Sequence, residues 1–360
     1  MTDKPSRQPL SPDGALSGGL GPAERYARQT LFHGIGRDGQ ARLSGARVLI
    51  AGCGATGTVL ASNLARAGVG YLRIVDRDFV EGNNLQRQVL FEEEDALLGT
   101  PKALAAKNRL AAINRFVEVD ARVADITAEN IESLLEGIDL ALDGTDNFET
   151  RYLLNDACIK LGIPWMYNGV IASYGVTMTI RPHETPCLRC VFPERPLPGT
   201  MPTCDTAGVL NGIVGVIGGI AATEALKLLI GSDRLSRGMT WVDLWENTWD
   251  SLEMARQDDC PACGHAQYDF LDAALDDSGT TLCGRNAVQV RGPRGKADTL
   301  DLAALAERLR EVGDVQSNGF LLRLAVDGYE LTIFPDARAI IKGTADTAVA
   351  RTLYARYVGM

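Results

Sequence analysis

Hydrophobic residues in the first half of the chain fall into short apolar runs separated by longer segments of helical periodicity. The strand-like runs lie at residues 47–51, 71–75, 117–123, 138–142 and 164–168. The helix-like segments between them lie at about 56–67, 102–114, 128–136 and 147–161. Strands that alternate with helices predict an α/β fold with a doubly wound, Rossmann-like and mostly parallel sheet.

The pattern continues with two more predicted strands, at 175–180 and 239–243, and a long apolar segment between them at 212–230. Glu224 and Lys227 interrupt this segment, and it is rich in glycine, so we expect a buried helix and not a membrane span. The first 21 residues hold no apolar stretch of the length a signal peptide needs. We therefore expect a cytoplasmic protein with no membrane partner.

Composition and patterning divide the chain into four parts. Residues 1–22 are rich in Pro, Gly and Ser and are expected to form a disordered tail, and 23–265 carry the α/β pattern. Residues 266–283 are acidic and turn-rich, which indicates a linker. Residues 284–360 are expected to form a small α+β domain. Its predicted strands lie at 287–290, 321–326, 329–334 and 339–342, and its predicted helices at 301–311 and 346–357.

The formal charge of the 360-residue chain is −10, which argues against a broad basic face for nucleic acid. A local basic pocket for phosphates remains compatible with this charge. Disulfides are rare in the cytosol, so the eight cysteines need another explanation.

A glycine-rich loop, Gly52-Cys53-Gly54-Ala55-Thr56-Gly57, follows the first strand. The first glycine allows a tight turn, the second lets a phosphate approach the backbone, and the third lets helix and strand pack closely. Asp76 ends the next strand, where a carboxylate can accept hydrogen bonds from ribose hydroxyls. This context predicts nucleotide binding, and the alternative is a βα turn whose glycines serve packing alone.

Cationic and acidic side chains beyond this loop favour a triphosphate over a dinucleotide. Arg87 and Lys102 follow the second strand, and Asp146 follows the strand at 138–142, so all three are expected near the ligand-binding edge of the sheet. ATP carries more charge than a nicotinamide dinucleotide and brings Mg²⁺, which Asp146 would hold. Asn84 and Gln86 would add polar contacts.

Each of these residues also has a purely structural interpretation. Arg87 would then be a surface residue, Lys102 would simply open a helix, and Asp146 would cap the helix that begins near Asn147. Their occurrence together, in this order after a nucleotide loop, favours the functional interpretation.

Two CxxC pairs, Cys187/Cys190 and Cys260/Cys263, predict a tetrahedral and structural Zn²⁺ site that joins distant segments. Two unrelated pairs, one of them redox-active, are the alternative, and His265 is a less favoured replacement ligand.

Four cysteines lie outside these pairs. We interpret Cys53, Cys158 and Cys283 as small buried residues. Cys204 lies in a Gly/Pro-rich stretch that is suited to carry a thiol to a reactive acyl group. No histidine stands near it in sequence, so an incidental or buried thiol is the alternative.

Taken together, these motifs resemble the ThiF/MoeB/HesA family, bacterial relatives of ubiquitin-activating enzymes, from about Arg25 to Cys263. The segments that carry the resemblance are Arg25-Tyr26-x-Arg28-Gln29, the glycine loop, Val75-Asp76-x-Asp78, Asn84-Leu85-Gln86-Arg87-Gln88, Gly99-Thr100-Pro101-Lys102, Asp143-x-Thr145-Asp146-Asn147 and the paired CxxC. The loop differs from the common family pattern at Ala55-Thr56, where glycine and an apolar residue often stand.

The resemblance implies a nucleotidyltransferase that adenylates the C-terminal glycine of a ubiquitin-fold sulfur carrier, with 23–265 as the adenylation domain. It also implies a homodimer, a structural zinc and a sulfurtransferase as donor. The implied catalytic residues are Arg28, Arg87, Lys102, Asp146 and Cys204. The implied nucleotide-binding residues are Gly52, Gly54, Gly57, Asp76, Asp78, Asn84, Arg87, Gln88, Lys102, Asp146 and Asn147.

By this likeness Asp76 binds ribose, while Asn84, Arg87 and Lys102 hold the phosphates. Arg28 would reach ATP, either in its own subunit or in a neighbouring one, and Cys204 would take part in sulfur transfer.

The region after residue 283 resembles an extension found in some adenylyltransferases of thiazole synthesis, which favours the thiamine carrier. The same chemistry on the molybdopterin-synthase small subunit, or on a carrier shared with tRNA thiolation, is the near alternative. An NAD-dependent oxidoreductase and a non-catalytic scaffold that senses nucleotide and zinc are the more distant alternatives.

Overall fold

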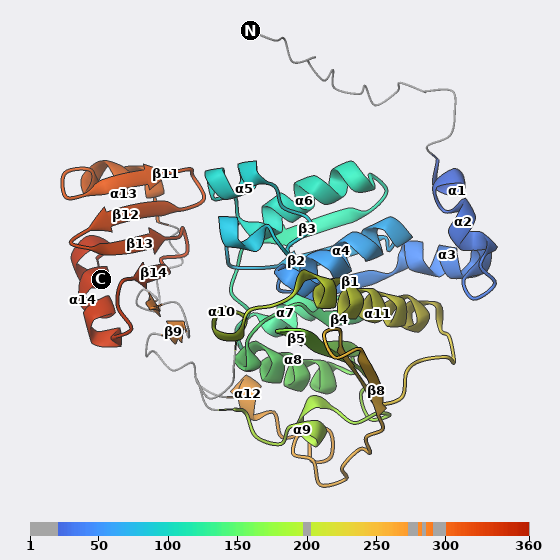
Figure 1. The fold of residues 1–360 in the computed structure, drawn as a ribbon. Helices are drawn as coiled ribbons and strands as arrows, with labels where there is room; N and C mark the ends of the chain where they lie inside the picture. Colours follow the sequence, from blue (N-terminus) through green and yellow to red (C-terminus); the bar gives the residue numbers. More distant parts are fainter. Residues whose placement is uncertain (1–20, 197–202, 273–279, 283–285, 291–299, 360) are drawn as a thin grey trace.

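The protein is described here by a computed structural model that covers residues 21–196, 203–272, 280–282, 286–290 and 300–359. Almost all of the predicted tail lies outside these residues. The larger part is an eight-stranded sheet in the order β3-β2-β1-β4-β5-β6-β7-β8 (Figure 1). Its strands are β1 (Arg47–Ala51), β2 (Tyr71–Val75), β3 (Glu118–Arg122), β4 (Leu140–Asp143), β5 (Trp165–Ile171), β6 (Tyr174–Ile180), β7 (Met239–Asp243) and β8 (Thr248–Leu252).

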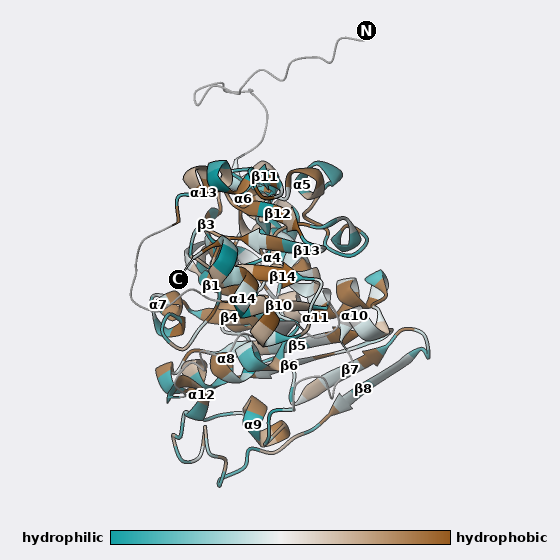
Figure 2. Cartoon of the chain, turned by 90° about the vertical axis from the view of Figure 1, so that its left-hand side faces the viewer, coloured by the Kyte–Doolittle hydropathy of each residue, from teal (hydrophilic) through white to brown (hydrophobic). Residues whose placement is uncertain are grey.

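The first five strands in chain order pair in parallel, and β6, β7 and β8 continue the sheet with antiparallel pairing. The predicted doubly wound, mostly parallel sheet is therefore confirmed. β8 was not predicted, and it lies at the edge of the sheet, where the β7–β8 hairpin extends from the body of the domain (Figure 2).

Helices cover both faces of this sheet, because two apolar clusters bury its two sides. One cluster packs α4 (Ala55–Ala67), α6 (Lys102–Ile113) and α11 (Asn211–Ile230) on the sheet. The other packs α7 (Ile131–Leu135), α8 (Phe148–Leu161) and α9 (Leu188–Val191). Shorter elements complete this part: α1 (Pro22–Arg25), α2 (Ala27–Leu31), α3 (Gly36–Gly45), η1 (Gly82–Asn84), α5 (Glu93–Leu98), α10 (Cys204–Ala207) and α12 (Asp269–Asp272).

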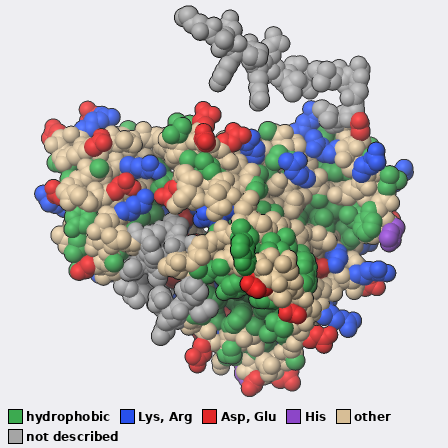
Figure 3. All heavy atoms as spheres, viewed as in Figure 1, with side chains coloured by type: hydrophobic (Ala, Val, Ile, Leu, Met, Phe, Trp, Pro, Cys, Tyr) green, Lys and Arg blue, Asp and Glu red, His purple; other side chains and the backbone are tan. Residues whose placement is uncertain are grey.

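Helix α11 is the apolar segment predicted to be a buried helix. By length and composition its stretch Asn211–Leu229 would suffice to cross a membrane, and it is the one such stretch among the described residues. In this fold it packs closely on α4: a Cβ added at Gly218 would lie 2.5 Å from Cγ1 of Val59. Apolar side chains also gather on the outer face of the molecule over α11 (Figure 3).

The C-terminal part is a six-stranded sheet in the order β11-β12-β13-β14-β10-β9, with antiparallel pairing throughout. Helices α13 (Leu302–Leu309) and α14 (Thr347–Tyr357) bury one face of it. Its strands are β9 (Thr280–Leu282), β10 (Ala287–Val290), β11 (Asp314–Ser317), β12 (Leu322–Val326), β13 (Tyr329–Ile333) and β14 (Ala339–Lys342). The predicted small α+β unit is thus present.

The segment 266–283, predicted as a linker, contributes α12 and also β9, which pairs with β10. The domain boundaries given above stay a prediction.

Candidate functional site

The strand order of the large sheet creates a crevice between β1 and β4. The chain runs outward from β1 to β2 and β3 on one side, and from β4 to β5 on the other. Ligands of doubly wound sheets bind at this switch point, beyond the carboxyl ends of the strands. A pocket opens there, and it is lined by Gly52, Gly54, Ala55, Val75, Asp76, Arg77, Asp78, Arg87, Gln88, Lys102, Ala124, Asp125, Ile126, Gly144, Thr145, Asp146, Asn147 and Thr150.

The glycine loop packs against the backbone that follows β4. Gly52 has φ +86°, which favours glycine. A Cβ at Gly57 would lie 2.1 Å from the carbonyl oxygen of Gly52, and one at Gly144 would lie 2.4 Å from the same oxygen. Helix α4 then begins at Ala55, so its free N–H groups and positive end face the pocket.

Two alanine substitutions in this loop should have different effects. A Cβ at Gly54 would meet only the Gly144 carbonyl oxygen at an ordinary 3.7 Å, whereas one at Gly57 has no space. We expect Gly57→Ala to lower the free energy of unfolding by about 1–3 kcal/mol. Gly54→Ala should keep its stability and lose nucleotide affinity, because the new methyl group lies where the phosphate approaches.

Thermal unfolding and ATP titration of both variants test this expectation. Equal losses of stability in Gly54→Ala and Gly57→Ala would contradict the assignment of separate roles.

Asp76 joins the loops that follow β1 and β2. One carboxylate oxygen accepts the N–H of Cys53 at 2.6 Å, and the other accepts the N–H of Asp78 at 2.7 Å. Burial raises the pKa of Asp76, and the nearby charge of Lys102 acts against that rise. The carboxylate therefore fixes the shape of the pocket and lines it, and its role as a ribose ligand stays a prediction.

Two cationic side chains reach the same pocket. Lys102 opens α6 and is only 6 % exposed, and its Nζ lies 3.4 Å from Oδ2 of Asp78. Arg87 is half-buried, and its Nη1 donates to the carbonyl oxygen of Asn83 at 2.7 Å. Burial of an ammonium group is costly, which favours a role for Lys102 beyond starting a helix.

Asn84 and Gln88 occupy different positions in this loop. Asn84 is buried and does not line the pocket; its side-chain oxygen accepts the N–H of Glu81 at 3.1 Å and so holds the turn that carries Arg87. Gln88 is buried and lines the pocket, and its Oε1 has no hydrogen-bond partner among the described residues. An orphaned acceptor of this kind indicates a ligand with a donor group.

Asp146 and Asn147 line the pocket beyond β4. The cap of α8 is Asn147, whose Oδ1 accepts the N–H of Thr150 at 2.9 Å. The structural interpretation of Asp146 as this cap is therefore wrong. Within the described part of the chain no hydrogen bond or ion pair engages the exposed Asp146 carboxylate, which is the form of donor that Mg²⁺ prefers.

The loop that carries Asp146 is held by a buried ion pair that the sequence did not reveal. Nε of Arg151 lies 2.8 Å from Oδ2 of Asp143, and Oδ1 of Asp143 accepts the N–H of Thr145 at 2.8 Å. Nη2 of Arg151 also donates to the carbonyl oxygens of Thr145 and Asn168.

A second unpredicted pair lines the pocket itself. Nη1 of Arg77 donates to both carboxylate oxygens of Asp125 at 3.2 Å. Burial opposes the charge of Arg77, but Asp125, Asp78 and Asp146 outweigh it and raise the pKa of Arg77. In the sequence, the one indication that Asp125 belongs to the pocket is its position just beyond the strand predicted at 117–123.

Arg28 lies far from the pocket of its own chain. It is exposed on α2, and the neighbouring Gln29 donates to the carbonyl oxygen of Ala67 at the end of α4. The glycine loop lies at the other end of this 13-residue helix, about 20 Å away. Figure 1 shows α2 at the far right of the molecule. A contact between Arg28 and nucleotide therefore requires a second copy of the chain.

Cys204 begins α10, and its side chain lies outside the described residues. The chain after α10 is anchored at the turn between β5 and β6, where Ala172 pairs with Val209 and donates to the carbonyl oxygen of Gly208. β5 is parallel to β1, so α10 belongs to the same carboxyl edge of the sheet as the pocket. Cys53 and Cys158 are buried, as predicted, and Cys283 is not among the described residues.

The four CxxC thiols form a compact cluster in which all sulfur atoms lie within 4.8 Å of one another. Sγ of Cys187 is 3.6 Å from Cys260 and 3.9 Å from Cys190, and Cys190 is 3.4 Å from Cys263. Tetrahedral zinc with bonds of about 2.3 Å places its sulfurs about 3.8 Å apart, so the set fits. The hydrogen bond between Cys187 and Cys190 lowers the pKa of Cys190 to about 5 and raises the pKa of Cys187, so the two thiols hold their protons unequally.

The model of the ThiF family matches residues 26–262. The chain is 43 % identical over 338 residues to the sulfur carrier protein ThiS adenylyltransferase of Bacillus subtilis, covering 93 % of this chain and 99 % of that protein. It is 39 % identical to the SAMP-activating enzyme E1 of Haloferax volcanii, covering 69 % and 92 %. The first of these matches covers nearly all of this chain and therefore includes most of the C-terminal sheet.

Among solved structures, E. coli MccB with ATP has the same fold, with a TM-score of 0.59 and 23 % identity over 67 % of this chain and 74 % of that one. The family model and the relatives agree on the family, and the solved structure shares the fold. The chain therefore belongs to the ThiF family.

Proposed function

We propose that this chain is a nucleotidyltransferase that uses ATP to adenylate the C-terminal glycine of a ubiquitin-fold sulfur carrier, the thiamine thiazole carrier in particular. One observation carries the proposal: a single pocket brings together a glycine loop, Asp76 and the cations Arg87 and Lys102. The relative that is similar over nearly the whole chain is named for adenylation of ThiS, which supports the choice of carrier.

In the proposed reaction the carrier's carboxylate oxygen attacks the α-phosphorus of ATP. The bond from that phosphorus to the bridging oxygen breaks, and the products are the acyl-adenylate and pyrophosphate. The carboxylate is already ionised at neutral pH, so no strong base is needed. Alignment by the loop amides, and neutralisation of the leaving pyrophosphate by Lys102 and Arg87, account for catalysis.

Two metals fit the residues present. Asp146 would hold Mg²⁺, which when bound supplies positive charge to the phosphates. The four clustered cysteines would hold Zn²⁺ away from the pocket, as a structural ion.

Exposure of Arg28 on α2 supports a homodimer in which this arginine enters the partner's site. The position of α10 at the same carboxyl edge of the sheet as the pocket supports a role for Cys204 in the sulfur-transfer step, with a sulfurtransferase as donor.

Purified carriers, tested one by one for stimulation of ATP–pyrophosphate exchange, test this proposal. Stimulation by the thiamine carrier above that by the molybdopterin-synthase subunit or a tRNA-thiolation carrier is expected. Equal stimulation by all three would reject the choice of carrier. Tight NADH binding with no exchange for any carrier would favour an oxidoreductase instead.

The proposed role of Cys204 gives a separate prediction. Cys204→Ala should keep carrier adenylation within about twofold of wild type and lose formation of the carrier thiocarboxylate, because the thiol acts only after the acyl-adenylate forms. Pyrophosphate exchange and mass spectrometry of the carrier measure the two steps. A variant that forms thiocarboxylate at the normal rate would remove Cys204 from the mechanism.

A further inference from the structure

The two sheets of this chain meet beside the nucleotide pocket. Residues alternate along β10: Val288 and Val290 face α13 and α14, while Ala287 belongs to a second cluster with Phe79 of the large domain. Leu321, Phe334 and Ile340 complete that cluster. One face of the small sheet is thus packed by its own helices and the other by the adenylation domain (Figure 1).

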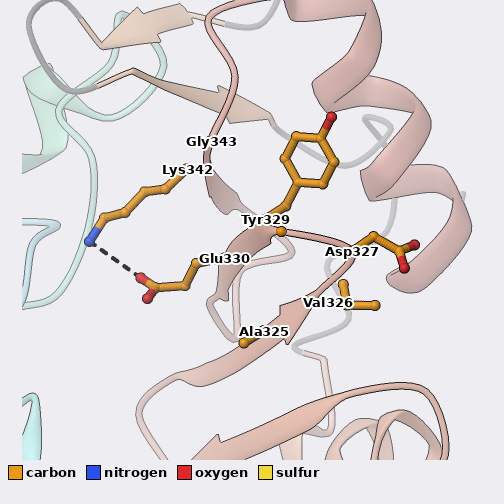
Figure 4. A pocket seen from close by; sticks show the side chains of 8 residues that line it. Ala325, Val326, Asp327, Tyr329, Glu330, Lys342 and Gly343 are labelled. Atoms are coloured by element: carbon orange, nitrogen blue, oxygen red, sulfur yellow. Dashed lines mark ion pairs between the residues drawn. The ribbon is translucent and has the colours of Figure 1, made fainter.

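The contact is made on the segment that carries the nucleotide-binding residues. Phe79 follows Asp78 directly, and it pairs with Pro101, the residue before Lys102. Lys342 of β14 adds a charged contact at the border, because its Nζ lies 3.3 Å from Glu81 of the large domain and 3.3 Å from Glu330. Figure 4 shows Lys342 extended toward Glu330 from the neighbouring strand.

Two polar side chains of the small domain reach the wall of the pocket. Nη2 of Arg338 donates to the carbonyl oxygen of Arg77 at 2.9 Å. Nε2 of Gln289 donates to Oδ2 of Asp125 at 3.4 Å. Since Arg77 and Asp125 bind each other and line the pocket, the C-terminal domain contacts both members of this pair.

Arg338 is costly to keep in this position. It is 2 % exposed and lies 3.9 Å from the centre of the Phe334 ring, with Asp336 at 3.6 Å. Its Nε and Nη1 have no hydrogen-bond partner among the described residues, nor does Oε1 of Gln289. A contact that served packing alone would be better made by an apolar side chain, because buried charges and orphaned polar atoms destabilise a fold.

We expect the wall that these residues contact to lie on the nucleoside side of the pocket. Arg77 follows β2 beside Asp76, the expected ribose ligand, and Asp125 follows β3 at the outer edge of the parallel strands. Lys102 and the amides of the glycine loop, by contrast, are the expected partners of the phosphates. Movement of the Arg77–Asp125 pair should therefore alter how tightly ATP binds more than how fast it reacts.

We propose that Arg338 is a positioning residue for the nucleotide site: with Gln289 it fixes the Arg77–Asp125 pair, so that docking of the C-terminal domain and binding of ATP favour each other. This inference rests on the proposed function for the identity of the nucleotide. Because such coupling is reciprocal, ATP should also tighten the contact between the domains.

The test compares Arg338→Met with Arg323→Met in the full-length chain. Arg323 contributes another cation to the same interface, where it lies 4.7 Å from the Phe79 ring centre. In carrier-dependent pyrophosphate exchange, Arg338→Met should raise the KM for ATP about tenfold, which is within the usual range for coupling between two sites. The kcat should stay within about twofold of wild type. Arg323→Met should leave both constants near wild type.

A second variant covers the case in which Arg338→Met does not fold. Gln289→Leu removes the contact to Asp125 and the orphaned acceptor together. It should raise the KM for ATP about threefold, the lower end of the range for one hydrogen bond, because this contact is long at 3.4 Å. Hydrogen exchange of residues 77–81 should slow on addition of ATP in wild type and not in Arg338→Met.

Two outcomes would overturn the inference. One is an unchanged KM in folded Arg338→Met or Gln289→Leu, and the other is an equal rise in Arg323→Met. Absence of ATP–pyrophosphate exchange in the wild type would instead reject the proposed function. The ATP affinities of the variants, measured by calorimetry, would then still test the inference.

Discussion

Replacement of Lys102 by alanine should lower the rate of carrier-dependent pyrophosphate exchange by about 10²–10³-fold, the usual cost of one preorganised donor to a developing anion. The ammonium group is held inside the pocket by Asp78, so it needs no rearrangement to meet the phosphates. The variant should fold normally, because an alanine at the first turn of α6 is a good helix former.

Lys107 provides the matched control, since it is an exposed lysine on the same helix. Lys107→Ala should exchange pyrophosphate at the wild-type rate. Near-normal exchange by Lys102→Ala would show that this cation does not act on the phosphates, and the same measurement on Arg87→Ala would then decide whether either cation does.

Replacement of Cys260 by serine should release the bound metal and lower the free energy of unfolding by several kcal/mol, on the order of 4. The cluster joins the turn at Cys187 and Cys190 to a loop some 70 residues later, and both belong to the apolar core on one face of the sheet. Without the ion, the thiols of Cys187 and Cys263 remain buried, that of Cys190 remains half-buried, and the two segments lose their common ligand.

Elemental analysis measures the loss of metal, and denaturant unfolding measures the loss of stability. Cys158→Ala is the control, because Cys158 is buried in the same core and lies outside the cluster. That variant should keep its metal. A Cys260→Ser protein with full metal content, or a metal-free wild type of unchanged stability, would contradict a structural zinc site.

The sequence predicted those parts of the site that depend on local pattern. The glycine loop, Asp76 and Lys102 each follow a strand or open a helix, and periodicity locates such elements. The pocket brings these three together as expected. The paired CxxC motif predicted the cysteine cluster in the same way, because each CxxC spacing is a local feature of one short turn.

The remaining features depend on contacts that no local pattern contains. Arg77 and Asp125 are 48 residues apart, and each alone resembles a surface charge. β8 was missed because all five of its residues are exposed, so no alternation of apolar and polar positions marks it. β11 was missed for a similar reason: it is an edge strand with no fully buried residue.

The place of the C-terminal sheet beside the pocket was also beyond prediction. In the sequence Phe79 is an ordinary apolar residue, and only the structure shows that it packs against the second sheet. Arg338 likewise has no signal in the sequence, since its partner is the backbone carbonyl of Arg77, 261 residues away.

The most direct test of the central claim is to follow the phosphates of ATP during the reaction. ATP labelled at the α-phosphate and ATP labelled at the γ-phosphate are each incubated with the enzyme and the thiamine carrier, and the carrier is analysed by mass spectrometry. We expect the α-label on the carrier's C-terminal glycine and the γ-label in pyrophosphate. A γ-label on the carrier, or no label on any carrier in the presence of bound ATP, would contradict it.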